Sequence, residues 1–353
     1  MIFLKNFIKL NKRKIDLKSH VFVIAEAGVN HNNNLSLAYK MIDVAKKAGA
    51  DAIKFQTFVS DEIQLKTSTK PNYQKKIKNP SYYKIIKSLE PSFRDQVKLS
   101  NYCKRKGILF LSTPYDEKSV DFLDSIKVPA FKIASTDLTN HFLLRYIAKK
   151  RKPIFLSTGL ADSKQVDESV NFLKKLKIKN QLIIFHTTSD YPAKNSEVNL
   201  NIIPEYIKKY HVPIGYFDHT QSDVASLGAI ALGARILEKH FTLDKKLPGP
   251  DQSSSLEPKE LTDWIKKIRI MESSLGENKK KITNSEKKNL SMRKVIVIKP
   301  SSRGTKLSTK HLTAMRGKNS GILPLDSNIR KILGTKLLFD IYEKREFSWN
   351  MIK

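Results

Sequence analysis

Short apolar runs alternate with amphipathic stretches along most of this chain, from residue 21 to about residue 275. Each run is too short for a helix, and each is followed by a polar turn and then by apolar residues at helical spacing. Eight such runs occur, at 21–26, 51–56, 108–113, 130–135, 153–158, 182–187, 212–217 and 235–241. Eight strands that alternate with helices over ~250 residues predict an α/β protein with a parallel (β/α)8 barrel, the TIM barrel.

The helical periods between these runs support the prediction. They lie at 35–48, 95–106, 119–126, 140–149, 164–176, 200–210, 223–232 and, as the last helix of the barrel, 257–275. The main irregularity is the segment 59–90, which is rich in Lys, Pro and Tyr and follows the second strand. A segment of this length predicts either a lid or substrate loop, or a surface excursion without a role in binding.

The chain is predicted to have four parts. Residues 1–20 are an N-terminal extension, 21–275 the barrel, 276–292 a charged linker, and 293–353 a small β-rich domain that opens with the apolar run 295–298. About sixty residues form only a marginal hydrophobic core. We therefore expect the last domain to lean on its own barrel or on another subunit.

The charge balance widens the range of possible partners. The 353 residues include 65 Lys and Arg against 34 Asp and Glu, a formal net charge of +31. Such an excess is compatible with a nucleic acid, a membrane surface or anionic small molecules. The basic residues are spread over the whole chain, and neither an aromatic RNA-binding motif nor a zinc-finger spacing is visible. We therefore expect anionic substrates and no nucleic-acid partner.

Two further features bear on the compartment. The first residues mix apolar and basic side chains without a run long enough for a signal peptide or a membrane span, so no membrane association is expected. The chain has a single cysteine, Cys103, which excludes a disulfide framework and fits a reducing compartment. We expect a cytoplasmic protein.

Polar residues stand at the carboxyl ends of the predicted strands, where the active site of such a barrel lies. In chain order they are Glu26, Lys54, Gln56, Thr113, Lys132, Ser135, Ser157, His186, Asp218, His219, Glu238 and His240. Their regular recurrence predicts a single site at one end of the barrel.

Two lysines within otherwise apolar strands carry the strongest signal. A buried ammonium group without a partner is costly, so Lys54 and Lys132 each require an anion. That anion is either a protein carboxylate such as Glu26 or a bound phosphate or carboxylate. With two lysines and several hydroxyl groups facing one mouth, we favour a bound ligand.

The two histidines form a second candidate group. Alternate strand residues point to opposite faces, so Glu238 and His240 share a face, and Asp218 and His219 end the preceding strand. One histidine near a strand is more often a structural residue with satisfied hydrogen bonds. Two histidines and two acids together predict a metal or acid/base site. A divalent ion that keeps open positions would suit it, namely Mn²⁺, Mg²⁺ or Zn²⁺.

The motifs at these strand ends closely resemble the sialic acid synthase family, from about residue 20 to residue 350. They are IAEAGVNHNNNL, AIKFQT, FLSTPYD, AFKIASTDLTN, PIFLSTGL, HTTSDYP, DHT, LEKHFTLD, PGPD and SLEP. The resemblance implies an enzyme that condenses phosphoenolpyruvate with N-acetylmannosamine or a related N-acetylated amino sugar. It also implies a divalent metal, Mn²⁺ or Mg²⁺, a C-terminal antifreeze-like (SAF, β-clip) domain, and a domain-swapped homodimer.

The resemblance also assigns roles to individual residues. The catalytic group comprises Glu26, Glu238 and Arg316, of which Arg316 would reach the partner's barrel. The metal ligands would be His219 and His240. The substrate-binding group comprises Lys54, Thr113, Lys132, Ser135 and Ser157 for phosphoenolpyruvate, and Gln56, Asp137, Tyr191 and Asp251 for the sugar.

Three departures from the family pattern bear on the substrate. Phe217 stands where the family commonly has Ser, which removes a hydroxyl group expected near the phosphate. Gln252–Ser254 stands where a His-Lys pair is frequent, and Gly317 replaces a Pro after the tail arginine. None of these changes replaces one of the two histidines or one of the two lysines.

The resemblance implies a mechanism, and three rivals remain open beside it. C3 of phosphoenolpyruvate would attack the C1 aldehyde of the open-chain sugar, water would add at C2, and phosphate would leave by C–O cleavage. The rivals are a metal-dependent sugar isomerase, a Schiff-base lyase that uses a barrel lysine, and a basic binding protein without enzymatic activity. The sequence also leaves open N-acetylmannosamine against the 6-deoxy diacetamido sugars that lead to legionaminic or pseudaminic acid.

Overall fold

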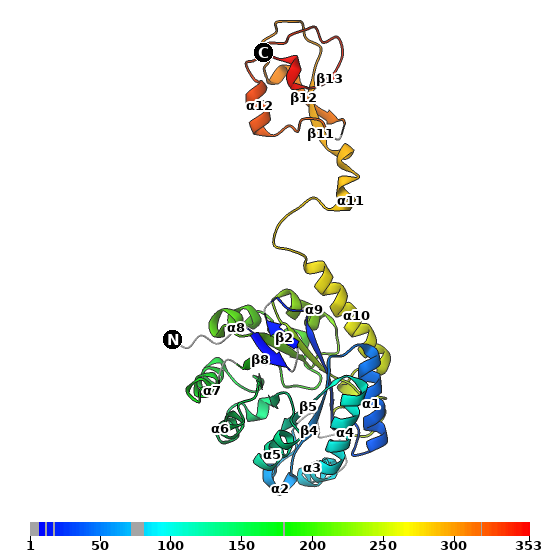
Figure 1. The fold of residues 1–353 in the computed structure, drawn as a ribbon, viewed down its shortest axis with the longest axis vertical. Helices are drawn as coiled ribbons and strands as arrows, with labels where there is room; N and C mark the ends of the chain where they lie inside the picture. Colours follow the sequence, from blue (N-terminus) through cyan, green and yellow to red (C-terminus); the bar gives the residue numbers. More distant parts are fainter. Residues whose placement is uncertain (1–6, 11–12, 17, 72–80, 179–180, 319) are drawn as a thin grey trace. The chain divides into compact units, whose positions relative to one another are not determined.

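The computed structural model describes residues 7–10, 13–16, 18–71, 81–178, 181–318 and 320–353. The chain separates into two compact units, Met1–Gly276 and Glu277–Lys353. The first unit contains the barrel, with helices arranged around the strands (Figure 1). It also contains every strand-end residue on which the predicted site depends.

Eight parallel strands form the sheet of the first unit and confirm the predicted (β/α)8 barrel. They are β3 (Phe22–Gly28), β4 (Ala52–Thr57), β5 (Leu109–Pro114), β6 (Phe131–Ile133), β7 (Ile154–Ser157), β8 (Leu182–Thr187), β9 (Ile214–Asp218) and β10 (Ile236–His240). Their order is β5-β4-β3-β10-β9-β8-β7-β6, so the last strand lies beside the first. The strand β6 falls furthest short of its predicted run, 130–135.

Helices cover the outside of this sheet. They are α1 (Leu35–Ala48), α4 (Phe93–Lys106), α5 (Glu117–Ser125), α6 (His141–Lys149), α7 (Ser163–Lys175), α8 (Ile202–Tyr210), α9 (Val224–Ala231) and α10 (Pro258–Leu275). Capping fixes several of these ends: Asn34 accepts a hydrogen bond from the amide of Leu37, and Gly49 ends α1 with φ of 93°. The segment after the second strand adds two short helices, α2 (Ser60–Ile63) and α3 (Tyr82–Leu89), whereas residues 72–80 lie outside the described part.

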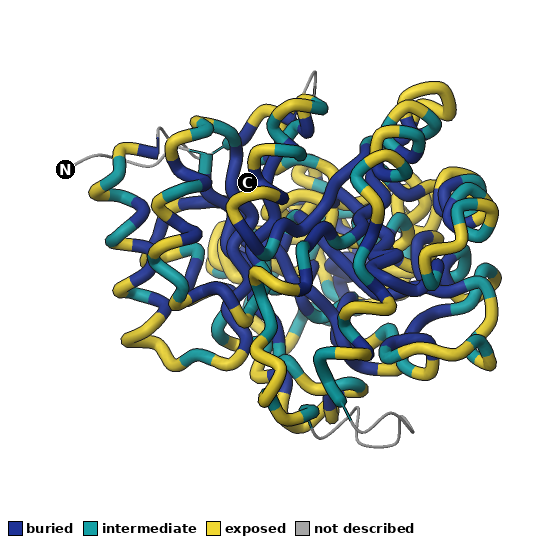
Figure 2. Tube along the Cα trace, turned by 90° about the horizontal axis from the view of Figure 1, so that it is seen from below, coloured by how far each residue is buried: buried dark blue, intermediate teal, exposed yellow. Residues whose placement is uncertain are grey.

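Alternation along each strand creates two apolar layers. Outward side chains pack against the helices in one large apolar cluster. Inward side chains form a second apolar cluster, which fills the barrel toward the amino-terminal ends of the strands. The strands are accordingly almost entirely buried, while the helices carry exposed outer faces (Figure 2).

The N-terminal extension forms a β-hairpin that the sequence pattern did not predict. Its strands are β1 (Phe7–Leu10) and β2 (Arg13–Asp16), which pair in antiparallel fashion. Ile8, Leu10 and Ile15 belong to the same inner cluster as Phe22 and Ile236, which begin or precede barrel strands. The hairpin therefore closes the amino-terminal end of the barrel with apolar side chains.

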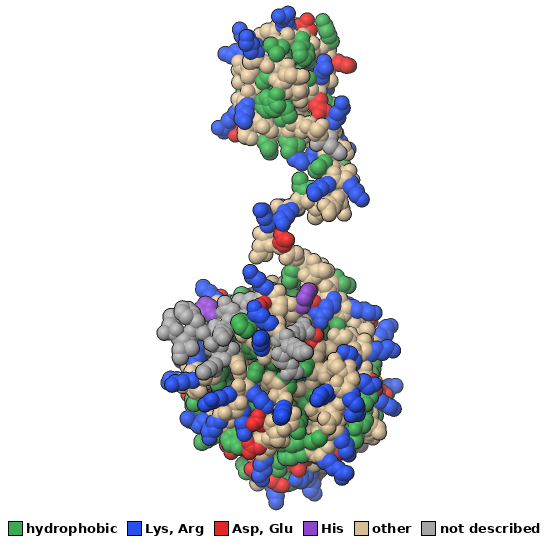
Figure 3. Space-filling model, in the orientation of Figure 1, with side chains coloured by type: hydrophobic (Ala, Val, Ile, Leu, Met, Phe, Trp, Pro, Cys, Tyr) green, Lys and Arg blue, Asp and Glu red, His purple; other side chains and the backbone are tan. Residues whose placement is uncertain are grey.

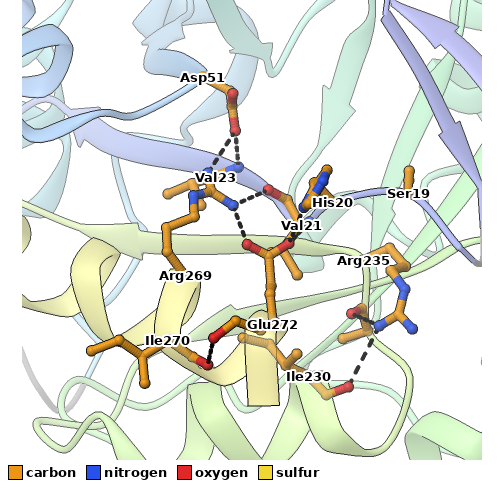
Figure 4. A network of polar contacts seen from close by, with 12 residues as sticks. Ser19, His20, Val21, Val23, Asp51, Ile230, Arg235, Arg269, Ile270 and Glu272 are labelled. Carbon is orange, nitrogen blue, oxygen red and sulfur yellow. Dashed lines mark hydrogen bonds and ion pairs between the residues drawn. The ribbon is translucent and has the colours of Figure 1, made fainter. Parts of the chain in front are cut away.

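A polar network at the same end ties α10 to the first strand (Figure 4). Arg269 donates to the carbonyl of Val21 at 2.8 Å and pairs with Glu272 at 2.7 Å and Asp51 at 3.5 Å. Asp51 in turn accepts a hydrogen bond from the amide of Val23 at 2.8 Å. The network joins the last helix of the barrel to its first strand.

The second unit contains a three-stranded antiparallel sheet. Its strands, in the order β12-β11-β13, are β11 (Lys294–Ile298), β12 (Leu312–Arg316) and β13 (Arg345–Glu346), with the short helices α11 (Asn284–Lys287) and α12 (Asp326–Ile332). A small buried cluster around Ile296, Ile298 and Phe347 forms its core. The assignment of this unit to the small β-rich SAF class stays a prediction.

Lys and Arg side chains are scattered over the visible surface without gathering into one patch (Figure 3). Among the described helices, none is long and apolar enough to cross a membrane.

Candidate active site

A cavity of about 880 Å³ opens at the carboxyl ends of the barrel strands. The predicted site residues that line it are Glu26, Lys54, Gln56, Thr113, Lys132, Ser135, Asp137, Ser157, Tyr191, His219, His240 and Asp251. Glu238 is fully buried and touches the two lysines of the cavity floor. Arg316 belongs to the second unit.

The floor of the cavity contains a buried cluster of two lysines and two glutamates. The Lys54 ammonium group lies 2.8 Å from a carboxylate oxygen of Glu26 and 3.4 Å from one of Glu238, and it donates to the hydroxyl of Thr113 at 2.8 Å. The Lys132 ammonium group lies 3.2 and 3.3 Å from the two oxygens of Glu238. Protein carboxylates therefore supply the anions that the two lysines require, whatever ligand the cavity also holds.

Burial shifts the proton affinities within this cluster. Desolvation raises the pKa of Glu26 to about 8, with the charge of Glu238 acting in the same direction. Desolvation also lowers the pKa of Lys132 to about 8. For Lys54, desolvation opposes the charged form, but the carboxylates of Glu238 and Glu26 outweigh it and raise the pKa. The cluster therefore contains a carboxylic acid and an ammonium group that can each exchange a proton near neutral pH.

Two histidines stand beside this cluster with their ring centroids 5.5 Å apart. Nδ1 of His219 lies 2.7 Å from the carbonyl oxygen of Thr188. Because a carbonyl only accepts, Nδ1 carries the proton and Nε2 keeps a lone pair. Within the described residues, Nε2 of His219 and Nδ1 of His240 are buried without a hydrogen-bond partner.

These histidines are suited to hold a divalent metal. Burial lowers the pKa of His219 to about 3 and that of His240 well below its usual range, so both rings are in the neutral form that binds metals. No group of three His, Cys, Asp or Glu side chains with metal-binding geometry occurs in the described residues. An ion held by the pair would therefore keep most of its positions open for ligands other than protein side chains.

Two serines contribute hydroxyl groups to the same cavity. The Ser135 hydroxyl accepts a hydrogen bond from the amide of Gly159 at 3.1 Å. The Ser157 hydroxyl is buried and has no hydrogen-bond partner among the described residues. A buried hydroxyl in this state retains its hydrogen-bonding capacity for a ligand.

The predicted sugar-binding residues Gln56, Asp137, Tyr191 and Asp251 line the same cavity, and Tyr191 contacts the histidines. The Tyr191 ring lies 4.2 Å from that of His219 and 5.7 Å from that of His240. Asp137 accepts a hydrogen bond from Asn140 at 3.0 Å. Burial raises the pKa of Asp251 to about 6. The cavity thus presents acidic and aromatic groups beyond its charged floor.

Two polar residues that the sequence placed at strand ends do not belong to the site. Asp218 points to the outer side of the sheet, where it pairs with Lys239 at 2.9 Å and accepts from Ser226 at 2.5 Å. His186 also faces outward, with Nε2 2.6 Å from the carbonyl of Val198 and its ring near Tyr206. Side chains alternate between the two faces of β8 and β9, and the residues on either side of His186 and Asp218 point into the barrel. His186 and Asp218 themselves therefore point outward, although both stand near a strand end.

The structure adds cavity residues that the sequence did not indicate. The polar additions include Glu62, Gln64, Thr69, Lys70, Thr136, Asn140, Ser189 and Asp190, and the apolar additions include Val29, Phe58, Ile63, Ile86 and Leu89 together with Tyr82 and Tyr115. The apolar residues follow β3, β4 and β5 or lie on α2 and α3, so the segment after the second strand lines the cavity. This supports the prediction of a substrate loop over that of a surface excursion. The sequence feature that could have indicated this lining is the set of apolar residues within this Lys-, Pro- and Tyr-rich segment.

The three departures have structural explanations. Phe217 lines the cavity between the lysines and the histidines. Gln252 is buried and donates from its amide to the carbonyl of Asn30 at 3.4 Å. Gly317 leaves room for its neighbours, because a Cβ atom there would lie 2.4 Å from a methyl carbon of Val295. Of the three departures, only Phe217 changes the lining of the cavity near the lysines and histidines.

A buried, charged floor beneath a large cavity at the carboxyl ends of a (β/α)8 barrel is typical of the class of barrel enzymes that bind small anionic or polar substrates. The family model described as the NeuB family matches residues 41–280. The chain therefore belongs to the NeuB family.

Relatives and solved structures agree with this family. The chain is 37% identical over 344 residues to an N,N'-diacetyllegionaminic acid synthase from Legionella pneumophila, covering 94% of each chain. It is 41% identical over 302 residues to a protein of the same name from Campylobacter jejuni, covering 84% of this chain and 90% of the other. A crystal structure of an N-acetylneuraminic acid (sialic acid) synthetase from Leptospira borgpetersenii, in complex with citrate, superposes with a TM-score of 0.72 at 34% identity, covering 83% of this chain and 98% of the other.

Proposed function

We propose that this protein condenses phosphoenolpyruvate with an N-acylated amino sugar to form a nonulosonic acid of the sialic type, with release of phosphate. The observation that carries the proposal is the buried cluster of two lysines and two glutamates beside two neutral histidines at the floor of one cavity. Membership in the NeuB family and the names of the relatives support it. The carbon–carbon bond forms between C3 of phosphoenolpyruvate and C1 of the open-chain sugar.

His219 and His240 would hold a divalent metal, for which we propose Mn²⁺ or Mg²⁺. When bound, such an ion supplies Lewis acidity toward the carbonyl oxygen of the sugar. The two neutral rings fit this role because each retains a nitrogen without a partner among the described residues. Zn²⁺ suits the same nitrogen ligands, and metal substitution will distinguish the three ions.

Phosphoenolpyruvate would bind at the floor of the cavity through Lys132, Lys54 and the hydroxyl groups of Thr113, Ser135 and Ser157. Lys132 contacts only the Glu238 carboxylate among the described acidic groups, so its ammonium keeps donor capacity for an anion. Lys54 already contacts Glu26, Glu238 and Thr113, so it contributes mainly charge. We therefore propose an ionic anchor and not a Schiff base.

Glu26 and Glu238 would manage protons and charge at the reacting carbons. Positive charge develops at C2 of phosphoenolpyruvate as its C3 attacks, and a nearby carboxylate stabilises it. A Glu26 side chain with a raised pKa can deliver or accept a proton near neutral pH. Water then adds at C2, and phosphate leaves by cleavage of the C–O bond.

Between the two sugar classes, we propose a 6-deoxy diacetamido sugar over N-acetylmannosamine, and apolar residues of the cavity support this choice. Above β3 to β5, the cavity lining includes an apolar wall formed by Val29, Phe58, Ile63 and Ile86. Acidic and hydroxyl groups line the rest of the cavity, among them Thr113 on β5 and Ser157 on β7. Methyl groups gain from burial against the apolar wall, at about 0.8 kcal/mol for each buried carbon, whereas a hydroxyl or phosphate at C6 does not. The names of the two relatives point the same way.

Phosphate release from phosphoenolpyruvate tests the proposal. The purified protein is incubated with Mn²⁺ and, in turn, a 2,4-diacetamido-2,4,6-trideoxy hexose, N-acetylmannosamine and its 6-phosphate. We expect release with the first sugar at the highest kcat/KM, and none with phosphoenolpyruvate or sugar alone. Excess EDTA should abolish the activity and Mn²⁺ should restore it. Absence of release with every sugar contradicts the proposal, and isomerised sugar formed without phosphoenolpyruvate identifies the rival isomerase.

A homodimer in which Arg316 serves the barrel of the partner subunit is proposed from the family resemblance alone. Arg316 is exposed within its own unit. The test refolds His240→Ala and Arg316→Ala together, so that subunits mix. Activity that returns only in the mixture supports the shared site. If sizing shows that mixed dimers have formed and no activity returns, the shared site is contradicted.

A further inference from the structure

The Lys132 ammonium group lies between two aromatic rings. Its Nζ atom is 4.5 Å from the ring centroid of Phe217 and 4.9 Å from that of Phe185. Glu238, at 3.2 Å, is its anionic partner within the described residues. Two ring faces and one carboxylate thus hold a cation that burial would otherwise penalise.

Phe217 also contacts both histidines. Its ring is stacked on that of His240, with centroids 5.2 Å apart and an interplanar angle of 26°, and it meets His219 edge to face at 4.2 Å. The side chain is 8% exposed and lines the cavity. One ring therefore contacts the lysine and both imidazoles, and it lines the cavity that a ligand would occupy.

The fold makes room for the second ring. Gly215 shares the inward face of β9 with Phe217, and a Cβ atom at Gly215 would lie 2.7 Å from two carbon atoms of the Phe185 ring. The absent side chain lets Phe185, which is fully buried, sit beside Lys132. Two positions of β9 thus build the aromatic surroundings of this lysine.

We propose that Phe217 is a positioning residue for the anionic substrate. This proposal rests on the proposed function. The electron-rich face of its ring stabilises the charged form of Lys132, and its bulk keeps water from the ammonium group. A serine in its place would supply one hydroxyl group but neither effect. Phe217 thus contributes to binding of the anion through Lys132 and not through its own contact with the anion.

Fluorination of the ring isolates this effect. 3,4,5-Trifluorophenylalanine is introduced at position 217, which withdraws electron density from the ring face while nearly preserving its shape. The matched control carries the same residue at Phe131, a fully buried phenylalanine on the outward face of β6, one residue before Lys132. Phosphoenolpyruvate binding is measured by titration calorimetry without sugar. We expect Kd to rise about three- to thirtyfold at position 217 and less than twofold at position 131.

A second variant keeps the test independent of fluorination. Phe217→Leu removes the ring but retains an apolar side chain, and it should raise Kd and KM for phosphoenolpyruvate by a similar factor while KM for the sugar changes less than threefold. An unchanged Kd in both variants overturns the proposal, as does an equal rise in the Phe131 control. Because the readout is binding, wild-type protein that binds phosphoenolpyruvate but releases no phosphate contradicts the proposed function while the comparison of Kd values still decides the role of Phe217.

Discussion

The two ends of the barrel differ in what they bury. At the amino-terminal end, Ile8, Leu10 and Ile15 of the hairpin fill the opening with aliphatic groups. At the carboxyl end, the same barrel buries ammonium, carboxylate and imidazole groups. The amino-terminal end gains stability from burial, whereas the carboxyl end pays desolvation costs to create reactive groups. Stability and reactivity are thus separated along the barrel axis.

Single strands show the same gradient. The inward residues of β3 run Phe22, Ile24 and Glu26, and those of β10 end with Glu238 and His240 after an isoleucine. On both strands, the inward residues change from apolar to polar toward the carboxyl end. Substitutions at the two ends should therefore separate stability from activity.

Glu238 should show the largest effect, because it pairs with both lysines. Glu238→Leu leaves two buried ammonium groups with one carboxylate, and it should lower the free energy of unfolding by about 3–5 kcal/mol and abolish turnover. Urea unfolding and phosphate release measure the two effects.

The matched control also removes the ammonium group of Lys132, which loses its carboxylate partner in Glu238→Leu. Glu238→Leu combined with Lys132→Met leaves Lys54 paired with Glu26. This double variant should regain most of the lost stability but none of the activity. A double variant as unstable as Glu238→Leu would show that packing, not charge, is what Glu238 provides.

Leu10 tests the opposite end of the barrel. Leu10→Ala removes a fully buried side chain and should cost about 2–5 kcal/mol of unfolding free energy. At temperatures where the variant stays folded, KM and kcat should match those of the wild type. Lys9→Ala, at an exposed position of the same strand, should change stability by less than about 0.5 kcal/mol. A change in KM for either substrate would mean that the hairpin influences the site.

Asp251 should give a smaller effect that depends on pH. Its pKa is raised from 3.8 to about 6 by burial, so the folded state binds the proton more tightly than the unfolded state does. Stability contributed by this group is therefore full below about pH 4 and is lost as the pH rises to about 6. Asp251→Asn should be more stable than the wild type by about 2–3 kcal/mol above pH 6 and equal to it below pH 4. It should also raise KM for the sugar. Parallel stability curves across this pH range would contradict the burial effect.

Ser157 should show the smallest effect on stability. Its hydroxyl has no hydrogen-bond partner among the described residues, so Ser157→Ala should leave the free energy of unfolding nearly unchanged. KM for phosphoenolpyruvate should rise about two- to tenfold, from the loss of about 0.5–1.5 kcal/mol. Ser112→Ala is the control, because the Ser112 hydroxyl bonds that of Thr57 at 2.6 Å. It should cost about 1 kcal/mol of stability without a change in KM; the reverse pattern would place the ligand elsewhere.

Much of the barrel could be predicted from periodicity, because its strands are buried on both faces and its helices on one. The hairpin was missed because basic residues interrupt its apolar ones, and a two-stranded ribbon gains its stability only from the barrel that it covers. Asp218 and His186 were misplaced because strand ends alone do not say which face a side chain takes. The sequence named Glu26 as a possible partner of the two lysines, but the pairing of both lysines with Glu238 required three dimensions, since these residues lie on different strands.

The pairing of β10 with β3 sets a condition on when activity can appear. His240 stands opposite Glu26 in this ladder, although more than two hundred residues separate them in the chain. Contacts of such long range form late, after the intervening loop entropy has been overcome. A nascent chain that has left the ribosome only as far as β9 has no site, however well its first strands are formed. Catalytic competence would therefore report that the last strand has docked beside the first.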